Sequence, residues 1–262
     1  MTNETEHWLI GVGAIGSFLL KEINRDKAHG IKIESVLVRD RRKYESLQSE
    51  FNVTLYTELD EFLCSNIDIV VEAANVEAVK TILPKAIKEK DTIIISIGAL
   101  ADEYFRQHVL HLANIHQHTI YLPSGAIGGL DLLQNAQTLG TVKKVSLTTR
   151  KPANSLVDHA IMDEVVVFEG KAADAIKQFP KNINVSIVLS LAGIGIDKTK
   201  VTIIADPHVD KNNHQVEIKG DFGSATFSIK NNSLPDNPKT SYLAAMSILG
   251  TLKRINGNVK IG

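Results

Sequence analysis

A glycine-rich loop with the sequence GVGAIG begins at Gly11, close to the start of this 262-residue chain. The apolar run Trp8–Ile10 precedes the loop, and Ser17–Ile23, whose apolar residues have helical spacing, follows it. In a strand–loop–helix unit, Gly11 permits the tight turn, Gly13 lets a pyrophosphate approach the backbone, and Gly16 lets the helix pack closely. Free N–H groups at the helix start attract phosphates, so the sequence predicts a dinucleotide-binding site. The predicted contacts in the loop are Gly11, Gly13, Ala14 and Ile15.

The composition is that of an ordinary globular protein. Apolar residues make up 44% of the chain and the formal net charge is -1, so no strong field favours nucleic acid or an anionic membrane. The single cysteine, Cys64, excludes an internal disulfide and a cysteine-based zinc cluster. The opening residues are polar and acidic, unlike a signal peptide, and no apolar run approaches the ~20 residues that span a bilayer. We therefore expect a soluble, cytoplasmic protein without nucleic-acid or membrane partners.

Four histidines lie close together in the middle of the chain, at His108, His111, His116 and His118. They lie among polar residues, with no carboxylate at ligand spacing and no cysteine nearby. We therefore expect a surface helix with its exit loop, and no metal site.

The first half of the chain alternates between strand-like and helix-like segments. The strand-like segments are apolar and rich in β-branched residues, as expected for a buried parallel sheet. They are Ile31–Val38, Ile67–Val71, Thr92–Ser96 and Thr119–Leu122. Val76–Lys88 has helical periodicity, and Asn75 lies where an N-cap belongs. This alternation predicts a doubly wound α/β fold, a Rossmann domain over residues 1–125.

After Pro123 the pattern changes to strands that alternate apolar and polar residues, which favours an antiparallel or mixed sheet with one open face. These strands are Val145–Thr149, Val201–Ala205, Gln215–Lys219 and Ala225–Lys230, with a hairpin turn at Gly220–Gly223. Helical segments at Ala172–Gln178 and Asn182–Leu191 interrupt them, so we expect a second, α+β domain over residues 126–237. A final helix over residues 238–255, with Pro238 in its first turn, can return to pack on the first domain.

The segment after the second predicted strand bears on the choice between NAD and NADP. Asp40 is placed to accept hydrogen bonds from the 2′-hydroxyl of NAD, whereas Arg39, Arg41 and Arg42 can pair with the 2′-phosphate of NADP. Both kinds of residue are present, so the cofactor is NAD or NADP. The alternative is a charged surface loop, and the position of the segment favours binding.

Small residues follow two other predicted strands, within Glu72–Asn75 and Ser96–Ala99. Ligands of open α/β sheets bind at this carboxyl edge, where a small residue such as Ala73 lets a cofactor ring approach the backbone. Tight packing between strand and helix explains such residues equally well.

The segment Ser124–Gly129 holds three glycines in six residues, at the predicted domain junction. Such a segment needs unusual backbone angles or close contact with a ligand, which makes Ala126 a candidate cofactor contact. A hinge is the alternative, and the two roles are compatible.

Asn184 lies in the first turn of a predicted helix, after Asn182 at the N-cap, and its amide both donates and accepts. A solvent-facing asparagine is the alternative there.

His214 differs from the other histidines because it begins a strand. By alternation it shares a face with Val216 and Ile218, while Gln215 and Glu217 face the other way. The apolar face packs inward, so His214 is expected at the rim of a buried surface. That place suits a general acid/base whose pKa depends on its surroundings, and a structural buried histidine is the alternative.

Several segments together resemble the L-aspartate dehydrogenase family over nearly the whole chain. Besides the glycine loop, which many families share, the carrying segments occur in a specific order. They are Ser96–Asp102, Pro123–Asp131, Thr148–Pro152, Phe179–Val185, Leu191–Gly195, Ala205–Pro207, Asn213–His214 and Pro235–Ser241.

The resemblance implies a homodimeric enzyme that oxidises L-aspartate with NAD or NADP. Hydride leaves the α-carbon to give iminosuccinate, which water converts to oxaloacetate and ammonia. In that family the histidine that matches His214 is the acid/base, and the asparagine that matches Asn184 contacts the cofactor. The family often supplies iminosuccinate for quinolinate formation in NAD biosynthesis.

Aspartate carries two carboxylates, so its pocket needs cationic or N–H donors. Lys239, at the start of the predicted last helix, is one candidate, and Lys151 and Lys181 are others. Two different functions stay open beside aspartate oxidation. One is a related reductase of another acidic imine or aldehyde, and the other is a non-catalytic dinucleotide-binding sensor.

Overall fold

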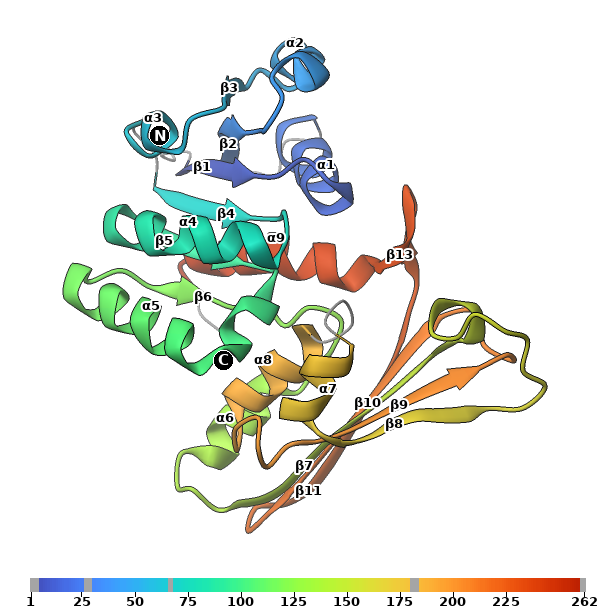
Figure 1. The fold of residues 1–262 in the computed structure, drawn as a ribbon. Coiled ribbons are helices and arrows are strands. Elements are labelled where there is room, and N and C mark those ends of the chain that lie inside the picture. Colours follow the sequence, from blue (N-terminus) through green and yellow to red (C-terminus); the bar gives the residue numbers. More distant parts are fainter. Residues whose placement is uncertain (1–4, 26–29, 66–67, 180–183, 260–262) are drawn as a thin grey trace. The chain divides into compact units, whose positions relative to one another are not determined.

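The computed structural model describes residues 5–25, 30–65, 68–179 and 184–259. The chain forms two compact units: unit 1 is Met1–Pro123 with Ala245–Ile261, and unit 2 is Ser124–Ala244. Each unit contains its own large β-sheet (Figure 1). Among the described residues, no helix is both long and apolar enough to cross a membrane.

The sheet of unit 1 has six strands in the order β3-β2-β1-β4-β5-β6, and every neighbouring pair is parallel. The strands are β1 (Thr5–Ile10), β2 (Ile31–Leu37), β3 (Thr54–Tyr56), β4 (Ile69–Glu72), β5 (Asp91–Ile94) and β6 (Ile120–Tyr121). This order is that of a doubly wound nucleotide-binding sheet, so the predicted fold class is confirmed. Ile67, the first residue of one predicted strand, lies outside the described residues.

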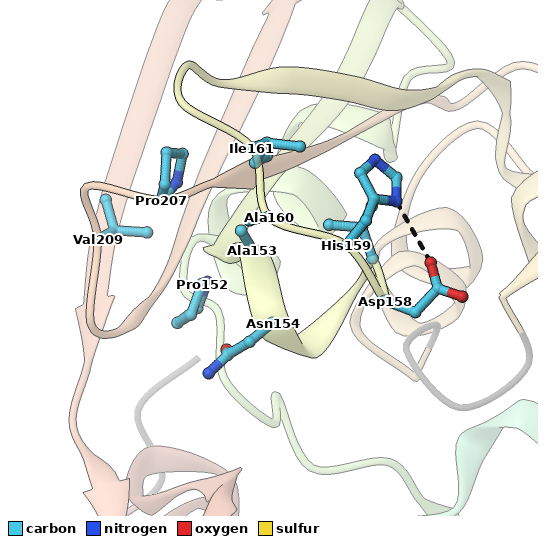
Figure 2. Close-up of a pocket in the computed structure, with 10 residues that line it drawn as sticks. Pro152, Ala153, Asn154, Asp158, His159, Ala160, Ile161, Pro207 and Val209 are labelled. Carbon is cyan, nitrogen blue, oxygen red and sulfur yellow. Dashed lines mark hydrogen bonds and ion pairs between the residues drawn. The ribbon is translucent and has the colours of Figure 1, made fainter.

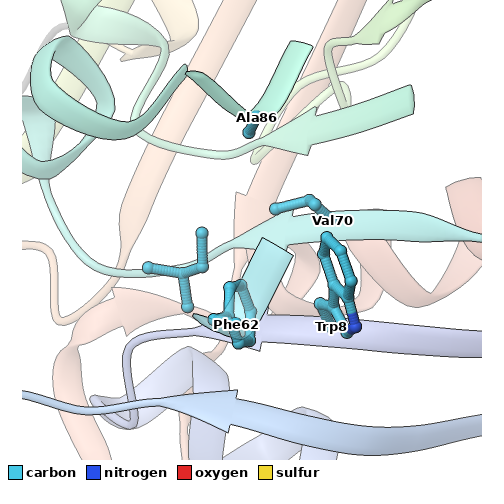
Figure 3. Packing of buried hydrophobic residues seen from close by; sticks show 5 residues of the cluster. Trp8, Phe62, Val70 and Ala86 are labelled. Atoms are coloured by element: carbon cyan, nitrogen blue, oxygen red, sulfur yellow. The ribbon is translucent and has the colours of Figure 1, made fainter. Parts of the chain in front are cut away.

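An aromatic cluster packs on one face of this sheet. Trp8 on β1 and Val70 on β4 lie against Phe62 and Ala86, and all four are buried (Figure 3). The rings of Trp8 and Phe62 are 4.9 Å apart between centroids and tilted by 40°. Each fully buried large side chain contributes about 1.5–3 kcal/mol, so this cluster fixes the end of β1 that leads into the glycine loop.

Six α-helices are described in unit 1, counting the last helix, of which Ala245–Asn256 belongs to this unit. They are α1 (Ala14–Leu20), α2 (Ser46–Phe51), α3 (Leu59–Leu63), α4 (Val76–Glu89), α5 (Glu103–His116) and α9 (Tyr242–Asn256). The predicted cap of α4 is confirmed, because Asn75 Oδ1 accepts a hydrogen bond of 3.0 Å from Ala78 N. At the end of α9, Asn256 Nδ2 lies 3.5 Å from Nε2 of the buried His7 on β1.

The predicted start of the last helix is wrong. The helix begins at Tyr242, and Pro238 and Lys239 lie in the short strand β13 (Asn237–Ser241). This strand pairs antiparallel with β12 (Ser233–Leu234), across a turn at Pro235 and Asp236. A proline fits this two-stranded edge, and the pairing outweighs the helix-start signal that proline gives.

The sheet of unit 2 has five strands in the order β11-β10-β7-β9-β8. The strands are β7 (Val142–Pro152), β8 (Val165–Lys171), β9 (Lys200–Asp206), β10 (Asn212–Gly220) and β11 (Gly223–Asn231). β7 and β9 are parallel and the other pairs are antiparallel, so the predicted mixed sheet is confirmed. β8 was not predicted, since its apolar residues Val165–Phe168 are consecutive and lack the alternation of the other strands.

Three helices lie against one face of this sheet and leave the other face open (Figure 1). They are α6 (Leu130–Gln137), α7 (Ala172–Gln178) and α8 (Asn184–Ala192). α7 has the predicted bounds, and its Ala172 and Ala175 pack on Phe168, Val201 and Ile203 of the sheet. The covered face is therefore apolar along most of its length.

Candidate active site

The backbone of the glycine loop explains two of its glycines. Gly11 has φ +91°, and a Cβ there would lie 2.7 Å from Ala74 Cβ. A Cβ on Gly16 would lie 2.1 Å from the carbonyl oxygen of Gly11. These positions exclude a side chain because the loop, the turn after β4 and the first turn of α1 approach one another closely.

Gly13 differs from both, because a Cβ there would meet no atom within 4 Å. The position is exposed, and Gly13 is the N-cap of α1 without a side chain that could cap the helix. The first N–H groups of α1, those of Ala14 and Ile15, follow this open position and donate no hydrogen bond to a capping side chain at Gly13. Room at Gly13 and uncapped helix donors are the features that a dinucleotide pyrophosphate requires, so these residues fit the cofactor.

Asp40 follows β2 on an exposed loop between exposed arginines. Its Oδ1 accepts hydrogen bonds from Arg42 N at 3.0 Å and Lys43 N at 3.3 Å. These bonds fix the carboxylate on the turn that follows it. Its Oδ2 has no hydrogen bond within the described part of the chain, which leaves this oxygen for a hydroxyl of a ligand.

A buried carboxylate, Glu72, joins two turns at the carboxyl edge of the sheet. Its Oε1 accepts hydrogen bonds from Ala74 N at 2.7 Å and Ser96 Oγ at 2.8 Å, and its Oε2 accepts one from Ser96 N at 3.1 Å. Burial raises the pKa of the Glu72 carboxyl, and the hydrogen bonds from Ser96 and Ala74 oppose that rise. Ala73, which follows Glu72 in the sequence, is buried, and its backbone N–H donates a hydrogen bond of 2.9 Å to Ile10 O.

The sequence interpretation gave Glu72 no role of its own. A carboxylate directly after the apolar run Ile69–Val71 is the signal that could have identified it, because a buried charge needs several donors. Through Ala74, which contacts Gly11, this residue determines the shape of the turn beside the glycine loop.

In unit 2, His214 lies on the covered face of the sheet, as the alternation predicted. It is 4% exposed, and Val216 and Ile218 on the same face are fully buried. His214 Nδ1 lies 3.0 Å from Thr149 Oγ1 on the neighbouring strand β7. Burial lowers the pKa of His214 to about 4, and the positive charge of Lys151 contributes to the decrease. The imidazole is therefore neutral near pH 7, the form in which it can accept a proton.

Lys151 is the charged residue that joins His214 in this region. It lies two residues after Thr149 on β7, so both residues belong to the same face of the sheet. Burial lowers the pKa of Lys151 to about 8, and its side chain is half-buried. The positive charge of Lys151 acts electrostatically on His214.

The small-residue segment Ser124–Gly129 leads into α6. Ala126 is buried, and its carbonyl accepts a hydrogen bond of 3.1 Å from Nδ2 of Asn231 at the end of β11. Gly129, with φ +81°, lies so close to Phe227 that a Cβ would be 2.3 Å from the ring. Packing within unit 2 therefore explains Gly129, and Asn231, which was not predicted, fixes the backbone of Ala126.

Asn184 is the first described residue of α8 and is exposed. The predicted N-cap Asn182 and the candidate Lys181 lie outside the described residues. Lys239 lies in β13 and not at the start of a helix. Among the predicted site residues of unit 2, the structure thus brings together His214 and Lys151, and it adds Thr149.

The predicted histidine cluster and the cavity of Figure 2 do not include His214. The residues of the predicted histidine cluster lie on α5 and in the segment after it, where His118 Nδ1 is 2.9 Å from Ile87 O. Among the described residues, no group of three His, Cys, Asp or Glu side chains could hold a metal ion. A cavity of about 470 Å³ opens between the ends of β7 and β9, lined by Pro152, Pro207 and the exposed pair Asp158 and His159 (Figure 2). His214 does not line it.

The parallel sheet of unit 1, with this glycine loop after its first strand, defines a dinucleotide-binding protein. Residues 11–123 match the family of homoserine dehydrogenase NAD-binding domains, and residues 131–255 match the family of aspartate dehydrogenase C-terminal domains. Curated L-aspartate dehydrogenases of Methanopyrus kandleri and Methanosarcina mazei are each 38% identical over 97% of this chain, covering 97% and 98% of their own lengths. The crystal structure of aspartate dehydrogenase from Thermotoga maritima superposes with a TM-score of 0.79, at 33% identity over 98% of this chain and 99% of that one. The chain belongs to the L-aspartate dehydrogenase family.

Proposed function

We propose that this chain oxidises L-aspartate to iminosuccinate with NAD or NADP, and that water then converts the product to oxaloacetate and ammonia. The observation that carries the proposal is the likeness to curated L-aspartate dehydrogenases over 97% of the chain. A buried, neutral imidazole beside a lysine gives this chain the groups that such a reaction needs.

NAD(P), when bound, supplies the acceptor for the hydride that leaves the substrate α-carbon. In this proposal His214 performs the proton chemistry. The substrate amine must lose a proton before it can release hydride, and His214, or a water molecule held by it, takes that proton. The imidazolium formed in this step returns the proton later, when a water molecule attacks the imine.

Lys151 binds a carboxylate of the substrate in this proposal. A carboxylate beside Lys151 offsets the positive charge that contributes to the low pKa of His214. Bound substrate therefore makes His214 a stronger base than it is in the protein alone. The half-buried position of Lys151 strengthens its attraction to a carboxylate, because fewer water molecules compete for the charge.

The proposed cofactor contacts divide by the part of the dinucleotide that they meet. The pyrophosphate lies against Gly11, Gly13, Ala14 and Ile15. Asp40 accepts from the 2′-hydroxyl of NAD, and the arginines around it pair with the 2′-phosphate of NADP. Ala73, Ala126 and Asn184 complete the cofactor site, the two alanines by leaving room and Asn184 through its amide.

The proposal also covers the location of the enzyme, its oligomeric state, its pathway and its domains. It acts as a cytoplasmic homodimer and supplies iminosuccinate to quinolinate formation in NAD biosynthesis. Residues 1–125 form the cofactor-binding domain, residues 126–237 the catalytic domain, and the last helix packs on the first. Sedimentation of the purified protein tests the dimer.

Replacing His214 by alanine tests the proposed chemistry. We expect aspartate oxidation to fall by at least ~10²-fold, the usual scale for lost acid–base catalysis, while NADH binding persists. His111→Ala is the matched control, since His111 is an exposed histidine on α5, and it should leave both quantities unchanged. Unchanged turnover in His214→Ala would refute the assigned role.

A further inference from the structure

We propose that Thr149 is a positioning residue, which holds His214 through Nδ1 and so reserves Nε2 for the substrate. This inference rests on the proposed function, and it concerns how the acid/base is oriented. Thr149 and His214 lie directly opposite each other in the antiparallel pair of β7 and β10. They are 3% and 4% exposed, and Thr149 Oγ1 is 3.0 Å from His214 Nδ1.

The register of the two strands explains why this contact forms. Side chains directly opposite each other in an antiparallel pair have Cβ atoms about 4.5–5.5 Å apart, which suits a hydrogen bond between a hydroxyl and an imidazole. Thr149 is β-branched, so its hydroxyl has few orientations available within the strand. Val145 and Leu147 precede it on the same face of β7 and are buried, which fixes the strand against the core of unit 2.

A hydroxyl suits this task because its oxygen can accept a hydrogen bond from Nδ1–H in both the neutral and the protonated imidazole. A neutral imidazole has one N–H group and one lone pair, and Nε2 makes no hydrogen bond within the described part of the chain. When Nδ1–H donates to Thr149, the lone pair of His214 lies on Nε2. A proton from the substrate ammonium group then forms an N–H bond at Nε2, and Nδ1–H continues to donate to the same oxygen. Thr149 keeps its own proton throughout.

The alternative is that Thr149 only fills space in the sheet. Its neighbour Thr148 provides a control, since it lies on the same strand and points to the opposite face. Thr149→Val keeps the shape of the side chain and removes the hydroxyl, whereas Thr149→Ser keeps the hydroxyl. If Thr149 only fills space, Thr149→Ser should lose more activity than Thr149→Val. If Thr149 positions His214, Thr149→Val should lose more activity than Thr149→Ser.

The test combines steady-state kinetics with nitrogen NMR of the imidazole. For Thr149→Val we expect kcat with L-aspartate to fall about 10- to 100-fold, the scale for a lost orienting partner, with NADH affinity unchanged. Thr149→Ser should recover most of the activity, and Thr148→Val should behave as the wild type. In the wild type, His214 should show one tautomer with the proton on Nδ1, and in Thr149→Val a mixture of tautomers.

Either of two results would overturn the inference: wild-type kcat in Thr149→Val, or a wild-type imidazole that already populates both tautomers. The melting temperature of each variant separates misfolding from misorientation. If the wild type does not oxidise aspartate, the proposed function fails, and the NMR measurement still decides whether Thr149 orients His214. The His214→Gln spectrum assigns the signal among the nine histidines.

Discussion

Replacing Gly13 by alanine should weaken cofactor binding and leave the fold intact. The added methyl group meets no atom within 4 Å, and φ -78° with ψ -165° is open to alanine. Removing a glycine stabilises the folded state by about 0.4–1 kcal/mol, and losing glycine at an N-cap offsets a similar amount. A bound pyrophosphate would instead meet the methyl group, and overpacking of this kind costs about 1–3 kcal/mol. We therefore expect NADH affinity to fall about 5- to 150-fold with little change in stability.

Gly16→Ala is the matched comparison in the same loop. Its Cβ would lie 2.1 Å from the backbone oxygen of Gly11, which cannot move without distorting the turn. This variant should lose about 3 kcal/mol or more of unfolding free energy before any ligand is added. Urea unfolding followed by the fluorescence of Trp8, the single and fully buried tryptophan, measures stability, and NADH titration measures affinity. Normal NADH binding by Gly13→Ala, or equal destabilisation of the two variants, would refute the reasoning.

Three further predictions concern titratable side chains that are buried or half-buried. Glu72→Gln turns an amide N–H₂ toward the donors of Ser96, so unfolding free energy should fall by about 1–3 kcal/mol in urea titrations, and an unchanged midpoint would contradict this. Lys151→Met should raise the KM for aspartate about tenfold or more. In the wild type, KM should rise as the pH passes about 8, because Lys151 then loses its charge. A KM that does not change with pH would argue against carboxylate binding by Lys151. His214 and His7 have pKa values of about 4 in the folded protein, against 6.5 for a solvent-exposed histidine, so the unfolded chain binds more protons between these values. Unfolding free energy should therefore decrease as the pH falls through this window, by about 3 kcal/mol for each histidine, and His214→Gln should have the shallower slope in pH-dependent urea unfolding. Equal slopes would contradict the depressed pKa of His214.

Local pattern was enough to predict much of this molecule. The glycine loop, the cap at Asn75 and most strands of the two large sheets follow from spacing and chemistry within a few residues, because neighbouring residues determine those features. The strands β3 and β8 are the exceptions, since neither segment was predicted as a strand. The inward direction of His214 also follows from strand alternation alone. The family resemblance then supplied the reaction.

Features that depend on contacts between residues far apart in the sequence could not be predicted from local pattern. Pro238 predicts the start of a helix, but its segment forms a strand that pairs with β12. This pairing depends on the turn at Pro235, which lies outside the local pattern around Pro238. The contact of Thr149 with His214 spans 65 positions, and that of Asn231 with Ala126 spans 105. Strand register brings Thr149 opposite His214, whereas Ala126 lies in a turn before α6, and the sequence contains no local signal for either contact.

The central claim, that this chain is an aspartate-oxidising dehydrogenase, is tested most directly by a substrate panel. Purified wild-type protein is incubated with NAD or NADP and with L-aspartate, D-aspartate, L-glutamate, L-alanine or L-malate, and NAD(P)H formation is followed. We predict that L-aspartate supports the fastest reduction, with oxaloacetate and ammonia formed in equal amounts. A faster reaction with another acid, or no reduction with any substrate despite NADH binding, would contradict the claim.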